Sequence, residues 1–171
     1  EVEQDTAKEG STNSRPNARV VSLLTPGNEG PIIEDDLGLE NHYSLANANR
    51  HITEFTSLAV ARFAEKYPSI GFIHAGPGIV NTGIMRELPW YVRCVATPIM
   101  FFASKPEDAA ERFFYVSTNN DYRTGYDLLM GGLKSVKEKM QDKGYLSKEL
   151  QEKVWNHTED TFKQALEKDS K

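Results

Sequence analysis

The sequence has only one cysteine, Cys94, so it cannot form an internal disulfide. Basic residues are also few: 20 Lys and Arg stand against 25 Asp and Glu, a net charge of −5. Proteins that bind nucleic acid or anionic membrane surfaces concentrate Lys and Arg. We therefore expect no nucleic-acid partner and no membrane association.

Long hydrophobic runs are missing as well. The longest apolar stretch, residues 88–103, is interrupted by Pro89, Arg93 and Pro98 and is shorter than the ~20 residues that cross a bilayer. The N-terminus shows no charged-then-apolar leader, and the sequence predicts a cytoplasmic location. His42 and His51 have no carboxylate or cysteine at metal-ligand spacing, so no metal site is predicted.

What remains has the composition of one ordinary globular domain, with 39% hydrophobic and 26% charged residues. Residues 1–17 are almost entirely polar and are predicted to be a flexible lead-in. Residues 18–171 are predicted to form a single domain.

Two strands and a long helix open this domain. Residues 19–24 carry β-branched side chains on both faces, which predicts a central strand. Residues 44–67 contain no Pro or Gly, and an apolar stripe at helical spacing predicts an amphipathic helix that buries Ile52, Phe55, Ala59 and Phe63. After Pro68, residues 70–75 predict a second buried strand. The order strand, helix, strand indicates a parallel βαβ unit.

The second half of the chain contains further helices. Residues 84–103 predict short helical pieces, and Ser104 with Glu107 forms a capping-box pattern before a helix over 106–116. Residues 126–133 fit either a short strand or a loop. Ser147 is predicted to cap a C-terminal helix that reaches about residue 168 and buries one face, made of Leu150, Val154, Phe162 and Leu166. The fold class is therefore α/β, a short parallel sheet with flanking helices, as in the second half of a Rossmann-like domain.

The stretch 70–82 is the best candidate for a ligand site. An apolar run ends abruptly in Gly76-Pro77-Gly78 and continues into Asn81-Thr82. This pattern predicts a strand that opens into a turn at the carboxyl edge of the sheet, where open α/β sheets bind ligands. His74, within the strand, is predicted to be a hydrogen-bonded core histidine, and the acidic loop 29–41, with Glu34, Asp35 and Asp36, to be solvated.

These features together resemble the C-terminal half of a short-chain dehydrogenase/reductase, and most closely the fungal branch of that superfamily. The resemblance covers roughly residues 18–166 and rests on blocks in the same order: Arg-Val-Val-Ser, Asp-Asp-Leu-Gly-Leu, Pro-Gly-x-Val-x-Thr, Ser-Lys-Pro-Glu-Asp-Ala-Ala-Glu-Arg and Val-Trp-x-His-Thr. It implies a truncated Rossmann-like fold and an oxidoreductase of fungal secondary metabolism.

The resemblance also implies a catalytic set. Tyr43 matches the family's catalytic tyrosine and Thr25 its serine, while Asn47 stands where the family has a lysine. A lysine four residues after the tyrosine lowers the tyrosine pKa and so helps it to exchange a proton with a substrate carbonyl. Asn47 brings no positive charge, and the family's Gly-rich phosphate-binding turn is not found in this sequence.

By the same resemblance, Pro77, Gly78 and Ile79 face the nicotinamide of NAD(P), and Thr82 faces its phosphates. We expect weak or no NAD(P) binding by the chain alone, because the adenosine half of the site is missing. His42, Trp90, Tyr91 and Met100 are the candidate contacts for a small hydrophobic metabolite. The segment around the last three residues is predicted either to form a lid or to cover the core.

The edge of strand 19–24 is expected to be covered by a second copy, by a partner chain or by the lead-in, because natural proteins protect apolar strand edges.

Three functions fit the sequence. The first is a reductase acting on a hydrophobic carbonyl or alcohol. The second is a cofactor-independent isomerase, cyclase or dehydratase that uses Tyr43 or His42 as acid or base, and the third is a non-catalytic interaction protein.

Overall fold

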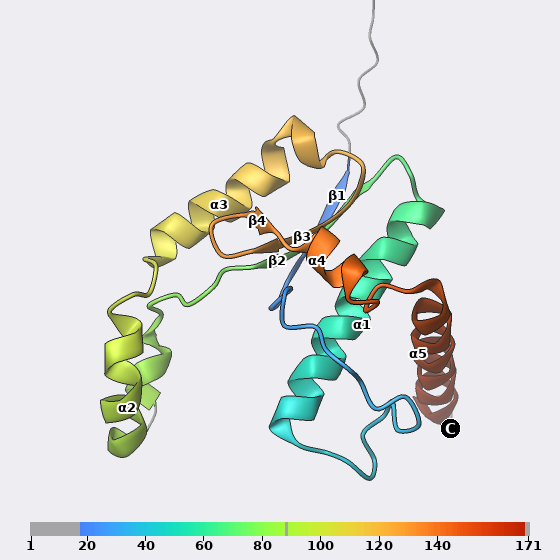
Figure 1. Ribbon diagram of the computed structural model, residues 1–171, viewed down its shortest axis with the longest axis horizontal. Helices are drawn as coiled ribbons and strands as arrows, with labels where there is room; N and C mark the ends of the chain where they lie inside the picture. The colour runs from blue at the N-terminus through green and yellow to red at the C-terminus, as the bar shows by residue number, and fades with distance from the viewer. Residues whose placement is uncertain (1–17, 88, 170–171) are drawn as a thin grey trace, which may run out of the picture.

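The computed structural model describes residues 18–87 and 89–169, and these form an α/β fold around one short sheet (Figure 1). Its strands are β1 (Arg19–Leu23), β2 (Gly71–Gly76), β3 (Gly125–Met130) and β4 (Lys134–Ser135), in the spatial order β1-β2-β3-β4. The first three strands are parallel, and β4 pairs antiparallel with β3. The predicted short parallel sheet is confirmed for β1, β2 and β3, to which the structure adds the antiparallel β4. Most of β3 lies in the segment 126–133, which fitted a strand or a loop.

Five α-helices and two 3₁₀ turns surround the sheet in the described part of the chain. They are α1 (Leu45–Lys66), η1 (Gly83–Glu87), α2 (Trp90–Met100), α3 (Pro106–Thr118), η2 (Asn120–Tyr122), α4 (Lys137–Asp142) and α5 (Lys148–Asp169). The long helix after β1, the helix after residue 105 and the C-terminal helix are confirmed.

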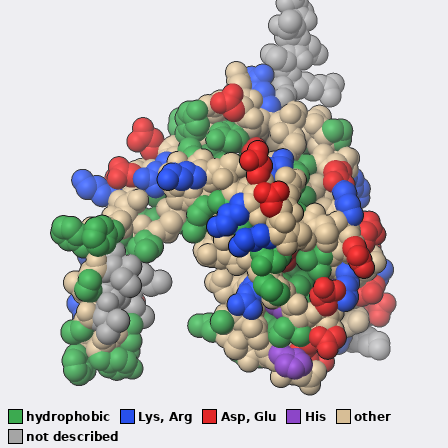
Figure 2. Space-filling view, in the orientation of Figure 1, with side chains coloured by type: hydrophobic (Ala, Val, Ile, Leu, Met, Phe, Trp, Pro, Cys, Tyr) green, Lys and Arg blue, Asp and Glu red, His purple; other side chains and the backbone are tan. Residues whose placement is uncertain are grey.

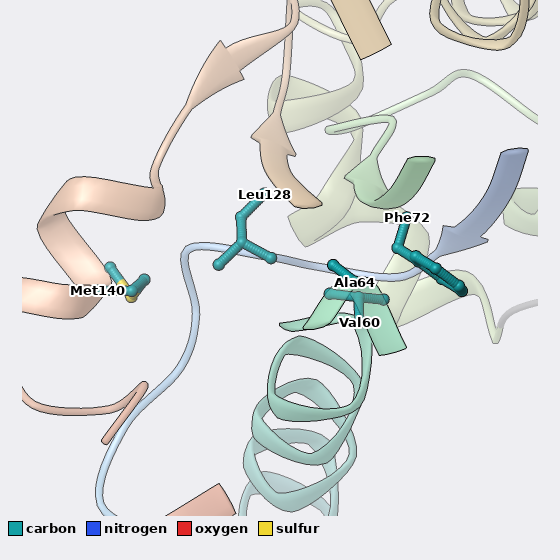
Figure 3. Close-up of a cluster of buried hydrophobic side chains, with 5 residues drawn as sticks. All are labelled: Val60, Ala64, Phe72, Leu128 and Met140. Carbon is teal, nitrogen blue, oxygen red and sulfur yellow. The ribbon is translucent and has the colours of Figure 1, made fainter. Parts of the chain in front are cut away.

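Helices α1 and α3 cover opposite faces of the sheet. On one face, Val60 and Ala64 of α1 pack with Phe72, Leu128 and Met140 (Figure 3). On the other face, Val116 of α3 packs with the alternate strand residues Ile73, Ala75 and Leu129. Because β1-α1-β2 and β2-α3-β3 advance in the same direction across the sheet, their crossovers have opposite hand, although nearly all such crossovers are right-handed.

The buried face of α1 differs from the predicted one. Ile52 is 54% exposed, and Phe55, Ala59 and Phe63 are only half-buried. The helix instead buries the face that contains Thr53, Glu54, Ser57, Leu58, Val60, Ala61 and Ala64. The prediction failed because it ranked side chains by hydrophobicity alone, whereas this polar face finds hydrogen-bond partners in β2 and in the loop after β1.

Strand β1 is an edge strand, not a central one, in the part of the chain that the structure describes. Val20 is 48% exposed and Leu23 is 55% exposed. Its single charged residue, Arg19, does not guard the edge, because the guanidinium donates to the backbone carbonyl groups of Ser117 in the last turn of α3 and of Asn119 and Tyr122 just beyond it. Arg19 thereby ties the start of β1 to the end of α3 and to η2.

Two helix predictions need correction. The N-cap of α3 is Lys105, and the hydroxyl of Ser104 accepts from Arg112 instead of forming the predicted capping box. In α5, Ser147 caps the first turn through the Leu150 N–H and Val154 is buried, as predicted, but Phe162 and Leu166 are 65% and 71% exposed.

Helix α2 stands apart from the sheet on an arm formed by residues 77–105 (Figure 1). The two stems of this arm are joined at Ser104, which donates its N–H to Ile79 O and accepts from Asn81 N–H, both at 2.9 Å. Figure 2 shows open space between the arm and the body of the molecule.

Candidate active site at the carboxyl edge of the sheet

The ends of β1 and β2 lie side by side. Leu23 pairs with Ala75, and the Leu24 N–H donates to Ala75 O at 3.1 Å. Thr25 and Pro77, each two residues beyond that pair, therefore leave the sheet at neighbouring points. This arrangement brings together the two segments that the sequence placed at a ligand site.

The turn after β2 depends on glycine at two positions. A Cβ on Gly76 would lie 2.9 Å from Met130 Sδ and 3.0 Å from both Leu24 O and Pro26 Cδ, so no larger residue fits without displacing its neighbours. Gly78 has a φ of +73°, which favours glycine. The turn is thus packed tightly between its neighbours on both sides.

Thr25 contacts the middle of α1. Its hydroxyl lies 3.0 Å from that of Thr53 in a side-chain hydrogen bond. Thr53 is about 12 Å along the helix axis from the first helical residue, Leu45, at 1.5 Å per residue. The part of α1 that faces the strand end is therefore well beyond its N-terminus.

Next to this pair lies a buried polar cluster, made of Glu29, Ser57 and His74. The Ser57 hydroxyl donates to Glu29 Oε1 at 2.6 Å and lies 2.8 Å from His74 Nδ1. Since its one proton goes to the carboxylate, Ser57 accepts from the Nδ1–H of His74. Glu29 Oε2 also accepts from the N–H of Gly27, which ties the loop after β1 to α1 and β2.

Glu54 adds a second carboxyl group to this region. It is fully buried, and neither of its side-chain oxygens makes a hydrogen bond of ordinary geometry among the described residues, although the Gly30 N–H still acts on the carboxyl group. Burial, together with the nearby charge of Glu29 and against the partial effect of the Gly30 N–H, raises the pKa of Glu54 to about 8. Glu54 is therefore a neutral carboxylic acid at pH 7.

His74 is a core histidine, as predicted, with no solvent exposure. Burial lowers its pKa to about 4, so its imidazole is neutral at pH 7. With the proton on Nδ1, its Nε2 carries a lone pair, and this atom has no partner in the part of the chain that the structure describes. The cluster thus holds three buried polar atoms that could accept a hydrogen bond or, at Glu54, donate one.

The sequence missed this cluster. Thr53, Glu54 and Ser57 recur at helical spacing on one side of α1, and this polar stripe was the one available signal.

The predicted residues at the N-terminus of α1 form a separate group. Tyr43 is 70% exposed and its phenol makes no hydrogen bond among the described residues. Asn47 donates its side-chain amide to the backbone carbonyl of His42 at 2.9 Å, and its N–H is capped by Ser44. No hydrogen bond, ion pair or ring contact within residues 18–87 and 89–169 joins Tyr43 or Asn47 to Thr25.

Asp36 corrects the view of the acidic loop as solvated. Its side chain is buried and accepts from the backbone N–H groups of Glu40, Asn41 and His42 and from His42 Nδ1 at 2.8 Å. Although burial acts to raise its pKa, these hydrogen bonds outweigh it and lower the pKa of Asp36 to about 2. Asp36 therefore holds the loop in front of α1 and orients the exposed ring of His42.

The arm carries the remaining predicted substrate contacts. Trp90 is 75% exposed and Tyr91 is 59% exposed, and they contact each other edge to face. Met100, at the end of α2, is half-buried. These side chains do not enter the core, and in the described residues no hydrogen bond or ring contact joins Trp90 or Tyr91 to Thr25, His42 or Tyr43.

An apolar groove of about 330 Å³ lies away from this edge, between β1, α1 and α5. Its walls include Val20, Phe55, Ala59, Phe63, Val154 and Trp155. We call it the α1–α5 groove. None of the described helices combines the length and the hydrophobicity that crossing a membrane requires.

Comparison with known proteins indicates a class of protein: the chain is similar, at low identity, to fungal oxidoreductases. No family model matches the sequence.

Among the individual relatives is oxidoreductase lepF of Aspergillus flavus, which is 26% identical over an alignment of 200 positions that covers 93% of this chain and 55% of that protein. Oxidoreductase andH of Emericella variicolor is 25% identical, covering 87% of this chain and 53% of the relative. The NmrA-like family domain-containing oxidoreductase notO of an Aspergillus species is 27% identical over 64% of this chain and 32% of its own length. The chain thus spans about half the length, or less, of these curated relatives.

Proposed function

We propose that this chain forms the substrate-side part of an NAD(P)-dependent oxidoreductase of the short-chain dehydrogenase/reductase type, which acts on a hydrophobic carbonyl or alcohol. The observation that carries the proposal is the pairing of β1 with β2. It sets Thr25 beside the Pro77–Gly78 turn at the carboxyl edge of a parallel sheet. The similarity to fungal oxidoreductases supports the same class of reaction.

In this proposal the residues of the turn hold the nicotinamide end of the cofactor. Ile79 is 52% exposed and can cover a flat ring, while Thr82, exposed three residues further on, can donate its hydroxyl to a phosphate oxygen. The cofactor supplies hydride, and the residues at the edge of the sheet orient the carbonyl group and provide the proton. The described residues contain no Gly-rich phosphate-binding turn, so binding by the chain alone is weak.

The proposal is tested by the nicotinamide half of the cofactor. We expect reduced nicotinamide mononucleotide to shift backbone NMR signals of residues 76–82 and of Thr25, with a Kd on the order of 1 mM, which is about 4 kcal/mol of binding. A Thr82→Ala variant should weaken this binding, and a Thr118→Ala variant, on α3, should leave it unchanged. Failure of the turn to respond at millimolar ligand, or a response confined to other residues, contradicts the proposal.

The complete enzyme in this proposal is an assembly in which further chain covers β1, either a second copy or a partner. Helix α1 packs mainly on β2 and β3, so the face of β1 is left to the α1–α5 groove. One helix covers about two strands, because helices pack roughly 10 Å apart and strands about 4.8 Å apart. A strand paired with β1 and a helix seated in the groove would complete that layer. Light scattering of the purified chain tests self-association, and a Val20→Lys variant should abolish it.

A further inference from the structure

Among the described residues, the three most exposed aromatic side chains lie on the arm, residues 77–105. Phe101 and Phe102, which follow α2, are 86% and 85% exposed, and Trp90, the first residue of α2, is 75% exposed. Figure 2 shows hydrophobic side chains gathered at both ends of the arm. Exposed apolar surface that is concentrated in this way marks a site of contact with a protein or a membrane.

Helix α2 is apolar around most of its circumference. Its polar side chains, Arg93 and Thr97, are four residues apart and therefore form one narrow stripe along the helix. A helix that packs on a protein surface needs an apolar stripe of only about 100°. Because the apolar part of α2 is much wider, it is better suited to a fluid apolar medium, which surrounds a helix, than to a protein groove, which contacts one side.

The charge of the arm is opposite in sign to that of the whole chain. Arg86, Arg93 and Lys105 stand against one acidic residue, Glu87, so the arm carries +2 whereas the whole chain carries −5. All three basic side chains are exposed. Anionic lipid headgroups attract basic residues that lie beside a hydrophobic segment. The expectation of no membrane association rested on the net charge of the whole chain, which hides this local excess.

The attachment of the arm leaves α2 accessible. Its two stems are joined where Ser104 pairs with Ile79 and Asn81. Within the part of the chain that the structure describes, every hydrogen bond and ring contact of residues 90–102 stays inside the arm. Since the arm also stands apart from the body in Figure 1, a flat surface can approach α2 without obstruction.

From these observations we propose that the arm is a membrane-docking element, which inserts α2 into the interface of an anionic lipid bilayer. The aromatic rings at the two ends of α2 enter the boundary between headgroups and acyl chains, where Trp and Tyr are enriched in membrane proteins. Arg93, with Arg86 and Lys105, contacts lipid phosphates. With 11 residues, α2 is about 16 Å long, so it lies in one leaflet and does not cross the core of about 30 Å.

Membrane docking would also bring the candidate active site to the bilayer. The first stem of the arm is the turn after β2, at Pro77 and Gly78, so a docked α2 holds this turn close to the lipid surface. A hydrophobic carbonyl compound partitions into membranes and could reach the site from there. This link to the substrate rests on the proposed function, whereas membrane docking itself does not.

The test uses the whole chain and vesicles of phosphatidylcholine with or without phosphatidylserine. The chain has two tryptophans, so in Trp155→Phe the emission reports on Trp90 alone. We expect this emission to shift to shorter wavelength with anionic vesicles at lipid concentrations on the order of 0.1 mM, and the wild-type chain to float with them. Arg93→Gln should weaken binding about fivefold on the anionic vesicles only.

The aromatic residues are tested by a double variant. Phe101→Ser combined with Phe102→Ser should weaken vesicle binding about tenfold or more, because two exposed rings no longer enter the lipid. Phe162→Ser, which removes an exposed ring from α5, is the matched control and should bind as the wild type does.

Absence of vesicle binding overturns the proposal, and so does binding that the double variant leaves unchanged. A second copy of the chain is the other partner that could cover the arm. If light scattering shows a dimer that the double variant dissociates, and neither protein binds vesicles, the arm belongs to an interface between copies. Vesicle binding without a response to nicotinamide mononucleotide would remove the oxidoreductase assignment alone, and the reverse result would remove membrane docking alone.

Discussion

The hydroxyl groups of Thr25 and Thr53, 3.0 Å apart, join the end of β1 to the middle of α1. This contact sets the register between the helix and the strand ends. It places the polar face of α1, and not its N-terminus, over the candidate active site. The consequences for stability can be measured residue by residue.

Glu54 should make the protein less stable as the pH rises. Its folded-state pKa, about 8, lies above its ordinary value of 4.5, so its contribution to stability is complete below pH 4.5 and is lost as the pH rises through 8. Compared with Glu54→Gln, the wild type should lose on the order of a few kcal/mol of unfolding free energy between pH 5 and pH 8. Urea unfolding at several pH values measures this difference.

Urea unfolding of Glu54→Gln at several pH values also isolates the contribution of His74 to stability, which depends on pH in the opposite direction. Its pKa is lowered from 6.5 to about 4, so its contribution is present above pH 6.5 and is lost as the pH falls toward 4. Glu54→Gln should therefore gain stability from pH 4 to pH 6.5 and remain level up to pH 8. Glu65→Gln, on the exposed side of α1, is the matched control and should follow the wild-type curve. Parallel stability curves for the wild type and Glu54→Gln would contradict the raised pKa of Glu54.

Ser57→Ala should destabilise the fold by about 1–3 kcal/mol, because it leaves buried polar groups on Glu29 and His74 without their partner. Thr56→Ala is the control on the adjacent position, where the hydroxyl bonds only to the carbonyl of the preceding turn, and it should change stability by less than about 0.5 kcal/mol. Chemical denaturation at pH 7 compares the two. Equal losses would show that the Ser57 contacts contribute nothing specific.

Asp36→Asn should loosen the loop in front of α1, because a neutral amide cannot accept four hydrogen bonds as the carboxylate does. Amide exchange of Glu40, Asn41 and His42 should accelerate, and in the wild type it should accelerate as the pH falls from 3.8 toward 2, where the carboxylate takes a proton. Asp35→Asn, at the exposed neighbouring position, should leave this exchange unchanged. Unchanged protection in Asp36→Asn would contradict the role of Asp36.

Gly71→Ala should destabilise the sheet by about 3 kcal/mol or more, because the added Cβ would lie 2.1 Å from the backbone oxygen of Tyr122. Gly83→Ala is the control, since its Cβ would meet nothing within 4 Å. Thermal unfolding of both variants provides the comparison. A Tm for Gly71→Ala equal to that of Gly83→Ala would mean that the backbone segments at residues 71 and 122 move apart at little cost in free energy.

The sequence predicted the elements of the fold better than their faces. Hydrophobic runs and the breaks at Pro68 and Gly76 located β1, α1 and β2 within about two residues, because these signals are local. The prediction of which side of α1 is buried was wrong because polar residues of the buried side find partners distant in sequence, as Ser57 does in Glu29 and His74. Local hydrophobicity carries no information about such partners.

The candidate site shows the same limit. The position of the turn at Pro77 and its closeness to Thr25 follow from parallel pairing, which the βαβ pattern predicts. The register of α1 against the strand ends does not follow from it, because the length of the loop between Thr25 and Leu45 leaves the helix free to slide along its axis. The catalytic role of Tyr43 is implied by the resemblance and stays a prediction.

Because α1 and α3 cover opposite faces of the sheet, the strands differ in how easily they can unfold. Strand β2 is buried along its whole length between two helices, so it can separate only if both layers unfold. Among the three parallel strands, β1 is paired on one side only and can detach first, with the segment that carries Thr25. The proposed substrate-handling edge thus joins the most deeply buried strand of the sheet to an edge strand, and whatever covers β1 controls the lifetime of that edge.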